Sequence, residues 1–240
     1  MSLSSMYHEV QHRINRLDFS MLWPNFKPYK FALYDQNDCY FNGEYIKKTQ
    51  AFYANTSISY EGEFIAIWFV NQEENAYDLD TLTASIVHEM FHAFQQESNE
   101  TRYPNEMEAL FNYDYNLENL TIKLQEAKLL EHALKSQSKT SFDQCLRFRK
   151  YRYKNYKDLY EYESKVEQIE GSALYVEIAS LKQLDENKAK IKMDNLLHNM
   201  NQPESYLPIR VISYSIGACL LLAIKKYTNL NVWGFMNVPY

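Results

Sequence analysis

Glycine, proline and cysteine are scarce in this chain, which has five, six and three of them among its 240 residues. So few glycines and prolines argue against flexible linkers and low-complexity segments. The three cysteines (Cys39, Cys145 and Cys219) lie far apart and form no CxxC pair. We therefore expect reduced, packed thiols, with neither a disulfide framework nor a cysteine-based metal site.

Long hydrophobic runs are also absent. Residues 1–16 contain no apolar signal-peptide core. The most apolar window, 209–224, includes Arg210 and is shorter than the roughly 18 residues that a membrane span needs. These absences predict a cytoplasmic protein with no membrane partner.

Positive net charge is missing as well, because the formal net charge is −6. An acidic chain is not attracted as a whole to nucleic acid. One basic stretch, 147–157, interleaves arginines and lysines with tyrosines. In this acidic context we interpret it as the solvated face of a helix and predict no nucleic-acid partner.

The residues that are present predict an α+β fold. Short β-rich segments are expected at 30–34, 39–41, 45–49, 50–55, 58–60 and 64–70, with turn-formers at Asn42-Gly43 and Glu61-Gly62. Helical periodicity is expected at 5–18, 106–113, 117–136, 142–184 (as one helix or two), 188–200 and 208–227. We expect one zincin-like domain over 1–240, with a small, mostly antiparallel sheet in 1–78 and helices in 79–240.

The segment His88-Glu89-Met90-Phe91-His92 lies at the junction of the two parts and carries the clearest chemical signal. Apolar residues at helical spacing predict a buried helix, with Asp80 and Thr81 as caps. Residues four apart share one helix face, so His88 and His92 can bind one Zn²⁺. Glu89 lies beside them, where it can take a proton from the water that zinc activates. The alternative is a buried helix with two satisfied histidines.

A catalytic zinc needs a third protein ligand and an open position. The best candidate is Glu170, in Ile169-Glu170-Gly171-Ser172-Ala173 on a later helix. Glycine inside a helix costs about 1 kcal/mol relative to alanine. We interpret Gly171 as a small residue that lets the zinc helix approach closely. Glu167 stays open as an alternative, either as the ligand itself or as a residue that orients a ligand histidine.

An HExxH helix followed by an acid-glycine-small pattern on a later helix resembles the gluzincin metallopeptidases, which include thermolysin-like enzymes and zinc aminopeptidases. The resemblance covers these two motifs and the order of sheet before helix. It implies one catalytic Zn²⁺ held by His88, His92 and Glu170, with Glu89 as general base. The longer HExxHxxGxxH of metzincins is absent.

This sequence departs from the gluzincin pattern at two positions. Thermolysin-like enzymes have an acid four residues after the glutamate ligand, where it supports a histidine, but this chain has Leu174. The residue before the ligand is Ile169, where the aminopeptidases commonly have asparagine. Because of these two departures, the resemblance assigns the chain to no characterised subfamily.

The reaction also needs a donor for the oxyanion of the tetrahedral intermediate. Gluzincins often use a downstream tyrosine or histidine, and the candidates here are Tyr214 and Arg210. They are four residues apart, with Gly217 one turn further on the same face, where a small residue could leave room for substrate. The alternative is a core tyrosine beside a surface arginine, and His132 and His198 are expected at the surface.

Together these features predict a zinc-dependent hydrolase whose partner is a peptide or protein substrate. In zincins an extended peptide pairs with the sheet edge beside the zinc helix. The strand at 64–70 is apolar enough that we expect it inside the sheet. Two alternatives remain: a non-proteolytic zincin-fold protein that acts in binding or regulation, and a hydrolase of non-peptide amides.

Overall fold

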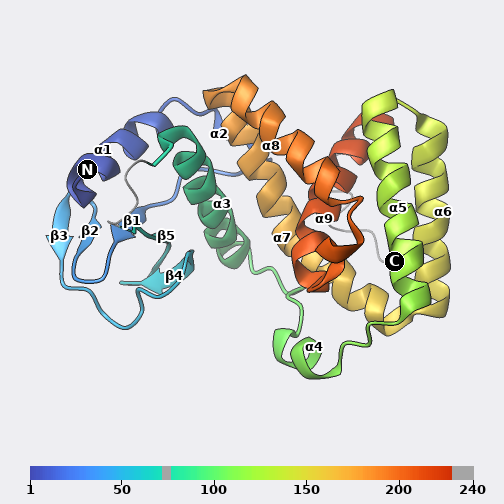
Figure 1. The fold of residues 1–240 in the computed structure, drawn as a ribbon. Helices are drawn as coiled ribbons and strands as arrows, with labels where there is room; N and C mark the ends of the chain where they lie inside the picture. Colours follow the sequence, from blue (N-terminus) through green and yellow to red (C-terminus); the bar gives the residue numbers. More distant parts are fainter. Residues whose placement is uncertain (72–76, 229–240) are drawn as a thin grey trace. The chain divides into compact units, whose positions relative to one another are not determined.

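The computed structural model describes residues 1–71 and 77–228 (Figure 1). The chain forms two compact units, one built from residues 1–100 and 176–191 and the other from residues 101–175 and 192–240. The boundary at residue 175 falls inside one uninterrupted helix, α7 (Lys157–Leu184). The end of α7 therefore belongs to the first unit, and its beginning belongs to the second.

A five-stranded mixed sheet is the centre of the first unit. Its strands are β1 (Phe31–Tyr34), β2 (Cys39–Phe41), β3 (Glu44–Ile46), β4 (Thr56–Tyr60) and β5 (Glu63–Phe69). The strand order is β3-β2-β1-β5-β4, and every neighbouring pair is antiparallel except β1 with β5. The prediction of a small, mostly antiparallel sheet followed by helices is confirmed, and β5 lies inside the sheet as expected. The strand expected at 50–55 was wrong, because that segment forms turns and a bend.

Two tight hairpin turns set the register of the sheet. Asn42 and Gly43 connect β2 to β3 with φ of 51° and 93°, and Glu61 and Gly62 connect β4 to β5 with φ of 50° and 83°. Two consecutive residues with positive φ form the hairpin turn whose twist matches that of the strands it joins. The turn residues identified in the sequence therefore connect the strands as predicted.

The two faces of the sheet pack differently. One face carries a buried cluster that includes Tyr34, Phe41 and Ile67 and is completed by Phe52 from the segment after β3. On β1, alternate side chains point to opposite faces, so Phe31 lies on the other side, where it stacks on Tyr7 of helix α1 (Leu3–Ile14) with ring centroids 4.3 Å apart. Helix α1 also packs against α3 (Leu79–Glu97), which in turn packs on β5 and β4. The helix that carries the HExxH motif therefore lies directly against the sheet.

Helix α3 begins earlier than the sequence suggested. Its N-cap is Asp78, whose carboxylate accepts a hydrogen bond from the Thr81 amide at 2.8 Å, and Asp80 lies in the first turn. The predicted caps, Asp80 and Thr81, were therefore wrong by two or three residues. Aspartate caps the orphan amides of the first turn, and a second acid there favours the positive end of the helix dipole. The helix is buried on almost every side, as expected for a core helix.

The second unit is helical in its described residues. It contains α4 (Glu106–Asn112), α5 (Leu117–Ser136), α6 (Lys139–Asn155), the beginning of α7, a short 3-10 turn η1 (Pro203–Tyr206) and α9 (Ile209–Tyr227). Helices α5 and α6 lie side by side (Figure 1). The stretch 142–184 is divided at Tyr156, so the two-helix alternative is correct. Helix α8 (Glu186–Asn199) follows α7, and a four-residue helix, α2 (Phe19–Leu22), follows α1. No helix in the described part of the chain is both long and apolar enough to cross a membrane.

Gly171 and Gly217 form the close crossing of α7 and α9. A Cβ added to Gly171 would lie 2.6 Å from Gly217 Cα, and one added to Gly217 would lie 2.3 Å from the Glu167 carbonyl oxygen. Two interpretations of these glycines were therefore wrong. Gly171 makes room for α9 and not for the zinc helix, and the space at Gly217 is filled by the backbone of α7.

Candidate metal centre

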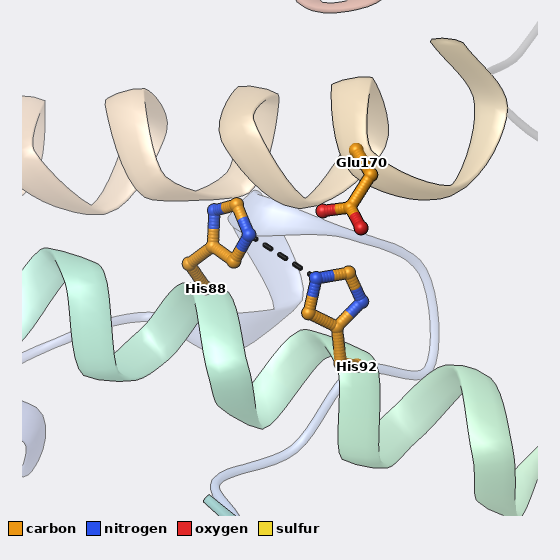
Figure 2. A group of neighbouring side chains, drawn as sticks. All are labelled: His88, His92 and Glu170. Carbon is orange, nitrogen blue, oxygen red and sulfur yellow. Dashed lines mark hydrogen bonds between the residues drawn. The ribbon is translucent and has the colours of Figure 1, made fainter. Parts of the chain in front are cut away.

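His88 and His92 lie one turn apart on α3, and their rings converge (Figure 2). The two Nε2 atoms are 3.1 Å apart, and the ring centroids are 4.9 Å apart. His88 is buried, with 9% of its surface exposed. The spacing of four residues therefore produces the shared point that the sequence predicted.

The Nδ1 atom of each ring lies against an oxygen acceptor. His88 Nδ1 is 3.0 Å from Glu177 Oε2, and His92 Nδ1 is 2.7 Å from Gln95 Oε1. A neutral imidazole that donates from Nδ1 has a lone pair on Nε2. Both rings are therefore oriented with their Nε2 lone pairs toward the same point.

Two lone pairs at this distance repel each other unless a proton or a metal cation lies between them. With Zn–N bonds of about 2.0–2.1 Å, two nitrogens of a tetrahedral zinc site lie roughly 3.3 Å apart. The observed separation of 3.1 Å is close to that value. The imidazole pair therefore fits a divalent metal, with the tautomers that metal binding requires.

Glu170 completes a group that could hold a metal ion. One ligand atom from each of His88, His92 and Glu170 lies within 4.8 Å of the other two. Figure 2 shows the Glu170 carboxylate projecting from α7 toward the two rings. Two imidazoles and one carboxylate make up the three-ligand set that catalytic zinc sites use.

Helix α7 itself explains why Glu170 lies at this place. Glu177, which belongs to the same unit as His88, holds that ring through its Nδ1. Glu170 precedes Glu177 by seven residues, about two turns or roughly 10 Å, on the same face of one continuous helix. The contact that orients His88 therefore also determines where α7 presents Glu170.

Glu177 accounts for the first departure from the gluzincin pattern. The acid that supports a ligand histidine is absent at residue 174 but present one turn later, at residue 177. Glu177 Oε1 also accepts a hydrogen bond from the Ser85 hydroxyl at 3.0 Å, which fixes the carboxylate. The second histidine is supported from its own helix by Gln95, three residues after His92. The sequence offered a signal for both partners, since Glu177 lies seven residues after Glu170 on one face of α7 and Gln95 lies three residues after His92 on α3.

Glu167 takes part in a different arrangement. Its Oε1 accepts from Lys123 Nζ at 2.9 Å and its Oε2 accepts from Arg149 Nη2 at 2.6 Å. The proposal that Glu167 orients a ligand histidine was therefore wrong, since Glu177 orients His88 and Gln95 orients His92. Glu167 is also outside the group of residues that could hold a metal.

Glu167 belongs to a buried ionic network between α5, α6 and α7. Three cations and three carboxylates form it: Lys123, Arg149, Arg152, Glu126, Glu163 and Glu167, none more than 5% exposed. Burial raises the pKa of Glu163, but Lys123 and Arg152 more than offset it and hold that pKa well below its usual range. The interpretation of 147–157 as a wholly solvated face was therefore wrong, because Arg149 and Arg152 are core residues.

Arg210 and Tyr214 lie beside the glutamate of the candidate centre. Arg210 Nη2 donates to Glu170 Oε1 at 2.8 Å, and its Nε donates to Glu106 Oε1 at 2.9 Å. The guanidinium lies over the Tyr214 ring, 5.0 Å from its centroid. Burial lowers the pKa of Arg210, but Glu170 and Glu106 raise it by more, so the side chain stays charged. Their role as oxyanion donors stays a prediction.

Glu89 is buried on α3 next to His88, with 9% of its surface exposed. His132 and His198 are exposed, as expected, and the three cysteines are buried free thiols.

Comparison of the chain with protein-family models, with curated proteins and with solved structures found no match. The case for a metal centre therefore depends on the His88–His92–Glu170 group alone.

Proposed function

We propose that this protein is a zinc-dependent peptidase of the gluzincin type, with one catalytic zinc ion. In this proposal His88, His92 and Glu170 bind the metal and Glu89 is the general base. The observation that carries the proposal is the pair of imidazoles, whose Nδ1 atoms are both occupied and whose Nε2 atoms converge at 3.1 Å beside a carboxylate. Such an arrangement serves a metal better than it serves packing alone.

A divalent zinc ion in this group would supply Lewis acidity, which activates water and polarises a carbonyl at neutral pH. In this proposal Glu89, which follows His88 directly on α3, takes the proton of the attacking water, as the HExxH motif implies. The same carboxylic acid then returns the proton to the amine that leaves. Tyr214, which lies over Arg210 beside Glu170, is proposed to donate a hydrogen bond to the oxyanion.

The edge of the sheet offers a place for an extended peptide. Strand β4 is the last strand on one side of the sheet, next to β5, and α3 packs against both. We propose that the substrate backbone adds to β4 as a further strand, which would align its carbonyls along the metal helix. Main-chain hydrogen bonds would then provide affinity that depends little on the substrate sequence.

Two measurements on purified protein test this proposal. The first is metal content by mass spectrometry, and we expect one zinc per chain. Two histidines and a carboxylate also bind Fe(II), so one iron per chain would contradict the zinc assignment. The second is hydrolysis of a peptide library by the wild type and by Glu89→Gln. General base catalysis contributes about 10²–10⁴-fold, so we expect a loss of that size with zinc content unchanged.

The matched control is Glu97→Gln, at the end of the same helix, where Glu97 pairs with Lys27 at the surface. It makes the same chemical change and should leave hydrolysis unaltered. Zinc binding without hydrolysis of any peptide would overturn the peptidase proposal and favour a role in binding or regulation. Hydrolysis that survives Glu89→Gln would overturn the assignment of the base.

A further inference from the structure

Arg210 is shared by two carboxylates from different elements of the second unit. Its Nε donates to Glu106 of α4, and its Nη2 donates to Glu170 of α7. We propose that Glu106, Arg210 and Glu170 form a clasp, in which Glu106 fixes Arg210 and Arg210 positions the Glu170 carboxylate. Through this clasp, α4 is coupled to the metal centre. The clasp depends on the proposed function in one respect, that Glu170 is a metal ligand.

The geometry of the guanidinium suits this role. Arginine presents its donors in a rigid planar fork, so fixing one edge on Glu106 also fixes the direction of Nη2. The central carbon of the guanidinium, Cζ, lies over the Tyr214 ring, 5.0 Å from the ring centroid. Arg210 Nη2 donates to one oxygen of Glu170, Oε1, and a carboxylate has two oxygens that can accept or coordinate. Residues that orient a metal ligand in this way commonly change metal affinity by about 10- to 100-fold when replaced.

Helix α4 depends on polar contacts for its place. None of its residues is buried, and three large apolar side chains on its outer face, Met107, Leu110 and Phe111, are 64–75% exposed. Glu106 accepts from Arg210 at Oε1 and from the Tyr162 hydroxyl at Oε2, at 2.9 and 3.0 Å. A helix without buried side chains opens easily, so its stability should follow these hydrogen bonds.

Coupling between two sites is reciprocal. If Glu106 strengthens metal binding through Arg210, then metal binding must strengthen the attachment of α4 by the same free energy. A purely structural role of Arg210 does not predict this. The clasp therefore predicts two linked observations, one at the metal and one at α4.

The experiment uses the full chain and zinc alone as the probe. Zinc affinity is measured by competition with a chromogenic chelator for the wild type, Arg210→Lys, Glu106→Gln and Glu108→Gln. Lysine retains the charge but has no planar fork, so Arg210→Lys should bind zinc about 10- to 100-fold more weakly. Glu106→Gln should bind zinc several-fold more weakly, and the visible spectrum of cobalt-substituted Arg210→Lys should change as Glu170 loses its orientation.

Hydrogen exchange of residues 105–112 provides the second readout. Zinc should slow exchange of these amides in the wild type and in Glu108→Gln, which makes the same change two residues away at an exposed side chain. The zinc effect should be lost in Glu106→Gln.

The clasp is wrong if both Arg210→Lys and Glu106→Gln bind zinc like the wild type. A loss of turnover in Arg210→Lys with unchanged zinc affinity would instead assign Arg210 to the oxyanion. Failure of the wild type itself to bind zinc would be the distinct failure of the proposed function.

Discussion

Each histidine of the candidate metal centre is oriented at Nδ1 by a different kind of hydrogen-bond acceptor. His88 donates to the Glu177 carboxylate and His92 to the Gln95 amide oxygen. A carboxylate partner makes an imidazole more basic and fixes its tautomer more firmly than a neutral amide does. At the scale of single residues, Glu177 therefore contributes more than Gln95 to fixing the tautomer and the orientation of the histidine that it contacts.

Replacement of Glu177 should weaken zinc binding by about 10- to 100-fold, because His88 loses the acceptor that fixes its tautomer. Glu177→Gln retains an oxygen acceptor and should lose less affinity than Glu177→Ala. The control is Glu161→Gln on the same helix, where Glu161 forms only an exposed pair with Lys157. Zinc competition measures all three, and equal affinity of Glu177→Ala and wild type would contradict the assignment.

Individual elements are held by charges of two kinds, buried and exposed. The α5–α6–α7 network is buried almost completely, whereas the start of α3 is held by partly exposed ions from α1 and α8. Removing one partner of a buried pair leaves an uncompensated charge, which costs much more than breaking an exposed pair. The two kinds of contact therefore predict different responses to mutation.

Arg152→Met should lower the free energy of unfolding by about 3–5 kcal/mol, because Glu126 and Glu163 each lose one of their two cationic partners in the core. The exposed pair Lys157–Glu161 supplies the comparison, and Lys157→Met should cost no more than about 1 kcal/mol. Urea unfolding followed by far-UV circular dichroism measures both variants. A similar small loss in the two would show that the network contributes little to stability.

The start of α3 should respond to acid. Burial raises the pKa of Asp78, but hydrogen bonds from Lys188 and Thr81 more than offset it and lower that pKa from 3.8 to about 2. The pKa of Asp80 is also lowered, chiefly by Lys188 and then by Arg13. Because the folded state binds these protons less readily than the unfolded state, the stabilisation is complete above about pH 5 and is lost as pH falls from 4 toward 2.

Lys188→Met tests this pH dependence. The pKa of Lys188 is raised to about 12, mainly by hydrogen bonds to Asp78 and Asp80, so its contribution is complete below about pH 10 and is lost as pH rises through 12. These ions are partly exposed, so the variant should be less stable by about 1 kcal/mol or less at pH 7. The difference from wild type should shrink between pH 4 and pH 2. A difference that stays constant down to pH 2 would exclude the aspartates as its source.

At the scale of the whole molecule, the sequence predicted the features that depend on local spacing. Helical periodicity and the turn pairs at 42–43 and 61–62 identified most elements, and the HExxH spacing identified the histidine pair. The sequence did not predict which residues of different helices and strands pack against one another. Gly171 contacts α9, and Arg149 and Arg152 enter the core, because the partner of a helix face is decided by tertiary packing that periodicity does not specify.

The central claim is that one metal ion is bound by two imidazoles of α3 and the carboxylate of Glu170. Zinc-edge X-ray absorption of the loaded protein tests this claim most directly. For the wild type we predict a first shell of nitrogen and oxygen at about 2.0–2.1 Å and the outer-shell scattering of two imidazoles. For Glu170→Ala we predict weaker zinc binding and a first shell that has lost one oxygen ligand. A shell that contains sulfur, or an identical spectrum and affinity in Glu170→Ala, would contradict it.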